Sequence, residues 1–325
     1  MPVTSEDVAR LAGVSRSAVS RAFTDGASVA PETRARIHEA AARLGYRPSP
    51  IARGLSGRRT GLVALIVGTL DRPFEAELLG RLAEGLRGLD ARPLVTLVPG
   101  SAAVDAALSD MLTYRVDGAI AAAGSLGPQA AELCAQARVP LVMINRAPAN
   151  VDAVLVDNAA GIAELVALHR AAGRRRLAWI GGTADTFSEV ERSRAFREAL
   201  AAAGLAAHAE RRGDYSVESG LAQALALLTE PVAPDAILCG NDAMAIGALS
   251  AARRLGRDVP GDVAITGYDG IAAAGWDTCA LTTVDVDAAA LADNALALLR
   301  RRLEGNEGPA TIVRIAPRLV RRASA

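Results

Sequence analysis

The spacing of hydrophobic residues changes near residue 60 of this 325-residue chain. Up to that point, apolar residues recur at the three-to-four-residue spacing of short amphipathic helices. From Gly61 onward, short apolar runs alternate with alanine-rich amphipathic segments. The pattern therefore predicts a small helical unit followed by a larger α/β unit.

The first 24 residues predict two short helices joined by a tight turn. Thr4 suits the N-cap of the first helix, and Asp7 stands three residues on, where it forms a partial capping box. Gly13 permits the turn, and Ser15 suits the N-cap of the second helix. Caps and turn in this order are typical of a helix-turn-helix.

The second helix sorts its residues onto two faces. At 100° per residue, one face gathers apolar side chains: Ala18, Val19, Ala22 and Phe23. The opposite face carries guanidinium and hydroxyl groups: Arg16, Ser17, Ser20 and Arg21. A face that only contacts solvent more often mixes both charge signs, whereas these groups suit guanine edges and phosphates. We therefore interpret this face as a DNA-binding surface.

A third helix completes the helical unit. Pro31 suits its first turn and Gly45 suits its C-terminal cap. Its apolar residues recur at i, i+3, i+4 and i+7, namely Ile37, Ala40, Ala41 and Leu44. Three amphipathic helices can share one small core.

The larger unit shows strands and helices in alternation. The predicted strands cover residues 62–67, 94–98, 118–123 and 139–144, with helices over 74–89 and 102–112. A second series opens at 177–180 and includes strands at 236–238 and 263–266. Short buried strands that alternate with helices predict doubly wound parallel sheets, and the restart predicts two lobes.

Polar pairs follow three of these strands: Asn145-Arg146, Asn241-Asp242 and Tyr268-Asp269. Doubly wound sheets bind ligands beyond the carboxyl ends of their strands. The chain has no GxGxxG after the first strand, no phosphate loop and no Ser-His-Asp grouping at a suitable spacing. The residues therefore predict a binding cleft and no catalytic site.

Charge is distributed unevenly, although the net charge is zero. Residues 1–60 contain ten of the 36 basic residues but only five of the 36 acidic ones. Every basic residue is arginine. The positive excess lies in the unit with the predicted DNA-binding face, as contact with phosphates requires.

Cysteine and histidine usage predicts neither disulfides nor a metal site. Cys134, Cys239 and Cys279 are far apart in apolar stretches, so we expect reduced thiols, and none of the three histidines forms a metal-like pair. No apolar run approaches 18 residues, and the N-terminus lacks a signal-peptide core. We expect no membrane span and no export, and hence a cytoplasmic protein.

These features together resemble the LacI/GalR family of bacterial transcription regulators over roughly residues 4–322. In the helical unit, the resemblance rests on Asp7-Val8-Ala9, Ala12-Gly13-Val14-Ser15 and Val19-Ser20-Arg21. In the larger unit, it rests on Asp157-Asn158, Glu191-Arg192, Gly213-Asp214-Tyr215-Ser216 and the three pairs named above. It implies a headpiece over residues 1–47, a hinge helix over 48–60 and a core over 61–325 that is similar to periplasmic sugar-binding proteins. The first lobe of that core would cover about 61–158 plus 288–316, and the second about 159–287 plus 317–325.

The resemblance also implies roles at the DNA. Arg16, Ser17 and Arg21 are expected to read bases, and Ser15, Thr33 and Tyr46 to hold phosphates, with Thr4 and Ser20 on the same surface. In this family a leucine of the hinge helix wedges into the minor groove. Leu55 stands at that position, among the matching residues Ser49, Ala52 and Arg53.

Seven effector contacts are implied in the core: Phe74, Glu75, Asn145, Arg192, Tyr215, Asn241 and Asp269. Three of them have a simpler alternative role. Arg192 shares its helix with Arg194 and Arg197 and can belong to a solvated basic face, while Asn241 can cap a helix. Glu75 replaces an aromatic that is frequent in the family. It favours a ligand with more hydroxyls or an amino group, unless it faces solvent.

The resulting hypothesis is a homodimeric repressor that binds a pseudo-palindromic operator in double-stranded DNA and is controlled by a small effector, a sugar or sugar derivative, without a cofactor. A sugar-binding transport protein with no role at DNA is the first alternative, because the core alone fits it. An enzyme of doubly wound fold is the second alternative.

Overall fold

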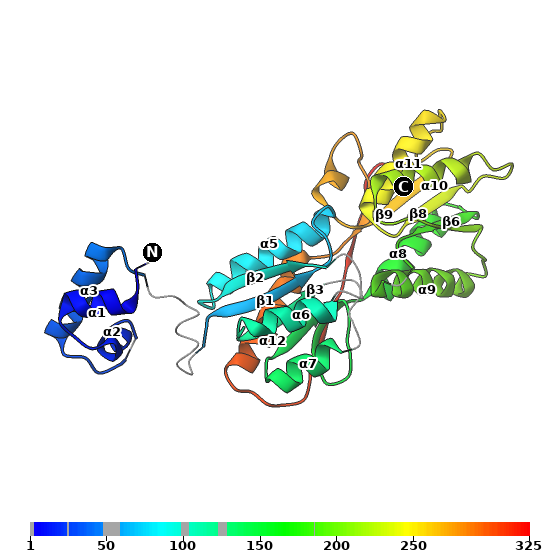
Figure 1. Ribbon diagram of the computed structural model, residues 1–325. Helices are drawn as coiled ribbons and strands as arrows, with labels where there is room; N and C mark the ends of the chain where they lie inside the picture. The colour runs from blue at the N-terminus through cyan, green and yellow to red at the C-terminus, as the bar shows by residue number, and fades with distance from the viewer. Residues whose placement is uncertain (1–2, 25, 48–58, 99–103, 123–128, 185) are drawn as a thin grey trace. The chain divides into compact units, whose positions relative to one another are not determined.

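The computed structural model describes residues 3–24, 26–47, 59–98, 104–122, 129–184 and 186–325. Two compact units make up the chain, Met1–Gly61 and Leu62–Ala325. In its described residues the first unit forms the helices α1 (Ser5–Ala12), α2 (Arg16–Ala22) and α3 (Pro31–Leu44) (Figure 1).

The predicted caps of these helices are confirmed. Asp7 N donates to Thr4 Oγ1 at 3.4 Å and Thr4 N donates to Asp7 Oδ2 at 3.0 Å, which completes a capping box. Gly13 and Gly45 end α1 and α3 in the left-handed conformation that glycine adopts without strain. The helices bury one shared apolar core, formed by Val8, Ala9, Ala12, Val19, Ala22, Ile37, Ala40 and Ala41.

The first lobe of the second unit is a six-stranded parallel sheet with the order β11-β5-β4-β3-β1-β2. Its strands are β1 (Leu62–Val67), β2 (Arg92–Leu97), β3 (Gly118–Ala122), β4 (Leu141–Ile144), β5 (Asp152–Val156) and β11 (Ile312–Ile315). The helices α5 (Pro73–Arg87) and α12 (Ala288–Leu303) pack on the face that holds Val63 and Leu65. The helices α6 (Val104–Thr113) and α7 (Ala130–Ala137) cover the face that holds Ala64 and Ile66. Successive side chains of a strand point to opposite faces, so one apolar run serves both cores.

The second lobe is also a six-stranded sheet, with the order β12-β10-β9-β8-β6-β7. Its strands are β6 (Leu177–Gly181), β7 (Ala209–Arg212), β8 (Ala236–Cys239), β9 (Ala264–Asp269), β10 (Thr282–Asp285) and β12 (Arg318–Val320). All pairs are parallel except β10 with β12. Its helices are α8 (Asn158–Ala171), α9 (Phe187–Ala202), α10 (Val217–Leu228) and α11 (Asp242–Arg254), and a short 3-10 helix covers Ala272–Gly275.

The chain passes between the two sheets three times. It leaves the first sheet after β5 to form α8, returns after β10 to form α12, and leaves again between β11 and β12. Two of these crossings are joined directly, because Asp157 N donates to the Ile315 carbonyl at 2.9 Å.

The predicted fold class is confirmed: three helices, then two doubly wound lobes. Predicted strand bounds agree with the structure to within a few residues. Five strands were not among the predicted apolar runs: β5, β7, β10, β11 and β12. Four of these are short or begin with polar residues, and β5 begins with Asp152, whose carboxylate is buried by Arg301 and Arg302 from α12.

Candidate functional site

The face of α2 that was predicted to bind DNA is exposed. Arg16, Ser17, Ser20 and Arg21 lie in solvent, while Val19 and Ala22 are buried in the headpiece core. Neither Arg16 nor Arg21 forms an ion pair with any residue that the structure describes. The two guanidinium groups are therefore available to an external acceptor.

The other headpiece residues surround this face or support it. Ser15 Oγ accepts from Ala18 N at 3.2 Å and lies 2.9 Å from Ser17 Oγ, so it caps α2. Tyr46 packs edge-on against Phe23 with 5.9 Å between ring centroids. Thr33 is half-buried in the first turn of α3, and the hydroxyl of Thr4 is held in its capping box. Ser49, Ala52, Arg53 and Leu55 lie outside the described residues.

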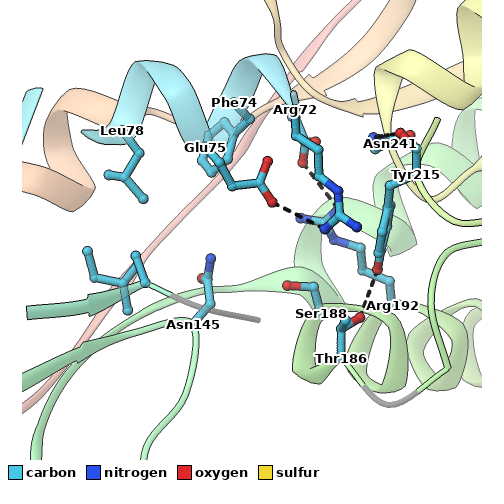
Figure 2. Close-up of a pocket in the computed structure, with 13 residues that line it drawn as sticks. Arg72, Phe74, Glu75, Leu78, Asn145, Thr186, Ser188, Arg192, Tyr215 and Asn241 are labelled. Atoms are coloured by element: carbon cyan, nitrogen blue, oxygen red, sulfur yellow. Dashed lines mark hydrogen bonds and ion pairs between the residues drawn. The ribbon is translucent and has the colours of Figure 1, made fainter. Parts of the chain in front are cut away.

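The core unit contains a cleft of about 600 Å³ that is lined by residues from both lobes (Figure 2). All seven predicted effector contacts lie in it, which brings together residues up to 195 positions apart in sequence. The thirteen lining residues are Arg72, Phe74, Glu75, Leu78, Ala122, Ile144, Asn145, Thr186, Ser188, Arg192, Tyr215, Asn241 and Asp269.

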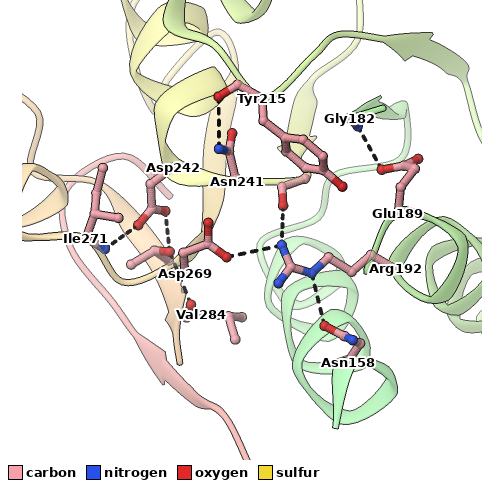
Figure 3. A network of polar contacts seen from close by, with 12 residues as sticks. Asn158, Gly182, Glu189, Arg192, Tyr215, Asn241, Asp242, Asp269, Ile271 and Val284 are labelled. Atoms are coloured by element: carbon pink, nitrogen blue, oxygen red, sulfur yellow. Dashed lines mark hydrogen bonds and ion pairs between the residues drawn. The ribbon is translucent and has the colours of Figure 1, made fainter. Parts of the chain in front are cut away.

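Arg192 is the best-held side chain of the cleft (Figure 3). Its Nε donates to Asn158 Oδ1 at 3.0 Å, and its Nη1 donates to the Gly240 carbonyl at 2.6 Å and to Asp269 Oδ1 at 3.1 Å. The ring of Tyr268 lies beneath the guanidinium, 3.8 Å away. The side chain of Arg192 keeps only 6% of its surface exposed.

The neighbours of Arg192 on the same helix behave differently. Arg194 and Arg197 are more than half exposed and pair with Glu191 and Glu210 near the surface. The solvated-face alternative therefore describes Arg194 and Arg197, and it is wrong for Arg192.

Two carboxyl groups, the half-buried Asp269 and the buried Asp242, lie at the carboxyl ends of β9 and β8. Burial raises the pKa of Asp269 to about 6, although the charge of Arg192 opposes the shift. Asp242 is fully buried; it accepts from Ile271 N at 2.8 Å and from the hydroxyl of Thr283. Burial, reinforced by the charge of Asp269, raises the pKa of Asp242 to about 8.

Asn241 caps a helix, which was the alternative role predicted for it. Its Oδ1 accepts from Met244 N at 2.9 Å and caps α11, while its Nδ2 donates to the Tyr215 carbonyl at 3.1 Å. It also lines the cleft, so capping and ligand contact remain compatible.

The first lobe reaches the second through the segment that begins α5. The Arg72 guanidinium lies over the Tyr215 ring and its Nη2 donates to the Asp214 carbonyl at 3.3 Å. Phe74 packs against apolar residues of both lobes. Glu75 Oε1 lies 3.5 Å from Arg72 Nη1, and the side chain of Glu75 is 26% exposed. Glu75 therefore lines the cleft and does not simply face solvent.

Three cleft residues adopt left-handed backbone conformations: Asn145 at φ 59°, Tyr215 at φ 71° and Asp269 at φ 109°. Such conformations are costly for residues other than glycine, and they cluster at ligand sites. Tyr215 also lies so close to Gly182 that a Cβ at residue 182 would come 2.0 Å from the ring. The fold therefore fixes the position of this ring.

Six lining residues were not among the predicted contacts: Arg72, Leu78, Ala122, Ile144, Thr186 and Ser188. Two signals could have revealed part of this set. Arg72 directly precedes Pro73 in the loop after a predicted strand, and Thr186 precedes Glu189 at capping-box spacing. Thr186 Oγ1 lies 3.0 Å from Tyr215 Oη.

The part of the chain that the structure describes contains no group of three His, Cys, Asp or Glu side chains that could hold a metal ion. None of its helices is long and apolar enough to cross a membrane.

Comparison with known families gives two matches. Residues 4–49 match the bacterial regulatory proteins of the lacI family, and residues 166–325 match the periplasmic binding protein-like domain. These two segments contain the helical unit and most of the second lobe.

Individual relatives extend the similarity to nearly the whole chain. The HTH-type transcriptional repressor PurR of Pectobacterium carotovorum is 30% identical over 99% of this chain and 96% of its own length. Catabolite control protein A of Priestia megaterium is 30% identical over 83% of each protein.

Solved structures agree with the sequence relatives. The lac repressor dimer bound to operator and the anti-inducer ONPF has a TM-score of 0.90 at 27% identity, over 100% of this chain and 99% of that chain. The complex of the transcriptional regulator CelR with cellobiose has a TM-score of 0.75 at 29% identity, over 99% of this chain and 100% of that chain.

Proposed function

The chain belongs to the lacI family of bacterial regulatory proteins and is a DNA-binding transcription regulator, and from this premise we propose that it is a homodimeric repressor whose hold on its operator is controlled by a small molecule in the cleft. The same headpiece is inconsistent with a transport protein, so that alternative is dropped. We infer that the protein acts in the cytoplasm and has no catalytic activity.

The observation that carries the proposal is the presence, in one chain, of unpaired arginines on α2 and a polar cleft between two lobes. Arg16 and Arg21 can reach guanine edges in a major groove, and a second headpiece in a dimer can occupy the next groove about 34–36 Å away. The relatives support this reading, since one of them was solved as a dimer on an operator.

Control by a small molecule follows from linkage. A ligand that prefers one arrangement of the lobes shifts the binding equilibrium by its difference in affinity, typically about 1–3 kcal/mol, and DNA must change ligand affinity by the same factor. Hydroxyl-rich ligands fit the carboxylate, amide and guanidinium groups that line the cleft. CelR, a relative of similar fold, was solved with cellobiose.

The test is selection of bound duplexes from a random pool by the full-length protein. The expected result is a two-fold-symmetric consensus with two half-sites. Selected duplexes that share no sequence motif, with an affinity that depends only on salt concentration, would refute a sequence-specific repressor.

A further inference from the structure

Three hydrogen-bond acceptors of the cleft have no donor from any other residue that the structure describes. Arg72 pairs with Glu75 Oε1, and Arg192 pairs with Asp269 Oδ1, which leaves Glu75 Oε2 and Asp269 Oδ2 without a partner from another residue. Asn145 Oδ1 is buried and accepts no hydrogen bond. These atoms come from both lobes, since Glu75 and Asn145 belong to the first and Asp269 to the second.

The two guanidinium groups of the cleft already have acceptors within the protein. Three acceptors hold Arg192, and Arg72 lies over the Tyr215 ring and donates to the Asp214 carbonyl. The contact between Arg72 and Glu75 is long, at 3.5 Å (Figure 2).

The two carboxyl groups also repel each other. Burial raises the pKa of Glu75 to about 7, and the charge of Asp269 contributes to this rise although Arg72 opposes it. A bound cation removes that repulsion, whereas a bound anion adds to it.

We propose that the ligand is a polyhydroxylated amine, such as an amino sugar, whose ammonium group binds between Glu75 and Asp269 and donates a third N–H to Asn145. An ammonium group has three donors and no acceptor, which matches the three free acceptors in number. Glu75 is then the residue that determines specificity for the amine. The proposal rests on the function proposed above, because it describes the ligand of the same cleft.

The experiment uses the full-length protein and matched series of probes that share one carbon skeleton: glucosamine, glucose and gluconate, and galactosamine, galactose and galactonate. Isothermal titration calorimetry at pH 7 measures the affinity of each probe. In at least one series, the amine is expected to bind at least tenfold more tightly than the neutral and acidic members. A neutral or acidic member that binds as tightly as its amine, or a panel in which no amine binds, overturns the proposal.

Variants connect the preference to Glu75. Glu75→Gln keeps the shape of the side chain and removes its charge, so amine affinity should fall about tenfold to a hundredfold. Affinity for the neutral sugar should change less than threefold. Glu77→Gln is the matched control, since Glu77 lies on the same helix, is about half exposed and pairs with Arg81 outside the cleft. Unchanged amine affinity in Glu75→Gln, with an unchanged melting temperature, also overturns the proposal.

The outcome separates this inference from the proposed function. If a neutral sugar releases the selected operator, the repressor function stands and the amine proposal fails. If an amine binds at Glu75 but the protein selects no operator, the amine proposal stands and the repressor function fails.

Discussion

The guanidinium carbon of Arg72 lies 4.8 Å from the ring centroid of Tyr215, although the two residues belong to different lobes. The Asp214 carbonyl accepts from the same arginine. One side chain of the first lobe therefore holds the loop of the second lobe that carries the cleft's tyrosine.

Removing that side chain should open the cleft. In Arg72→Ala the lobes lose a cation–π contact and a hydrogen bond, together worth about 1 kcal/mol, which shifts the balance between lobe arrangements about fivefold. Small-angle X-ray scattering of the ligand-free protein should show a larger radius of gyration. Arg81→Ala, which removes an exposed arginine from α5, should scatter as the wild type does. Identical curves for all three proteins would show that Arg72 does not hold the lobes.

Replacing Arg21 on α2 should relax sequence recognition. Arg21→Ala removes a guanidinium suited to a bidentate contact with guanine, at an expected cost of about 1–3 kcal/mol at one symmetric pair of operator positions. Competition binding with operators altered at single positions measures this cost. Arg36→Ala, at an exposed position of α3, is the control. An equal loss on every DNA sequence would instead identify Arg21 as a phosphate contact.

His169 should make the protein less stable in mild acid. It is fully buried in the second lobe, its Nε2 lies 3.1 Å from Thr266 Oγ1, and burial lowers its pKa to about 4. Between pH 6.5 and 4 the unfolded chain takes up a proton that the folded chain does not. The contribution of His169 to the free energy of unfolding should therefore fall by about 3 kcal/mol as pH falls through this window.

His169→Gln tests the assignment, because glutamine can still bond to Thr266 but does not titrate. Urea denaturation at several pH values should show that the free energy of unfolding of this variant, relative to that of the wild type, rises as pH falls from 6.5 to 4. His38→Gln, at an exposed position, should show no such rise relative to the wild type. If it is the His38 variant that shows the rise, the assignment to His169 is wrong.

Asp242 acts in the opposite direction, over a pH range that includes the range of His169 and extends above it. Its folded pKa of about 8 lies above its value in an unfolded chain, so its contribution is complete below about pH 4 and is lost as pH rises through 8. Above pH 6.5 this loss is no longer offset by His169, and stability should fall by up to about 1.4 kcal/mol per pH unit. Asp242→Asn should flatten the decline between pH 6.5 and 8 in the same denaturation experiment. A decline as steep as that of the wild type would assign it to another group.

Gly247 should tolerate no side chain. It lies where α11 meets α10, and a Cβ there would come 2.1 Å from the Val217 carbonyl oxygen. Because backbone atoms cannot move aside as a side chain does, Gly247→Ala should destabilise the protein by about 2 kcal/mol or more. Gly80→Ala provides the contrast, since Gly80 lies in α5 with open space around it and alanine favours a helix. Urea midpoints compare the two variants, and equal midpoints would show that the α10–α11 contact can relax.

The sequence predicts those parts of the structure that depend on neighbours along the chain. Caps such as Thr4 and Ser15, and the apolar run from Leu62 to Val67, are local signals, and the structure confirms them. The seven cleft residues were predicted from the resemblance to the LacI/GalR family, and in the structure they line one cleft.

The remaining features depend on contacts between distant residues. Strand β5 begins with Asp152, and only arginines 149 and 150 positions away make that carboxylate suitable for burial. Arg72 is a loop residue in sequence and a bridge between lobes only in the fold. The left-handed conformation of Tyr215 has no signal in the sequence, because nothing near it along the chain marks an aromatic residue for that region.

The three chain crossings between the sheets limit how the lobes can move. With one flexible connection, one lobe could rotate in any direction relative to the other. With three connections, two of them joined by the bond from Asp157 N to the Ile315 carbonyl, a motion is allowed only if all three segments bend together. The lobes are therefore restricted to few degrees of freedom, and ligands of different shape must produce variations of one movement.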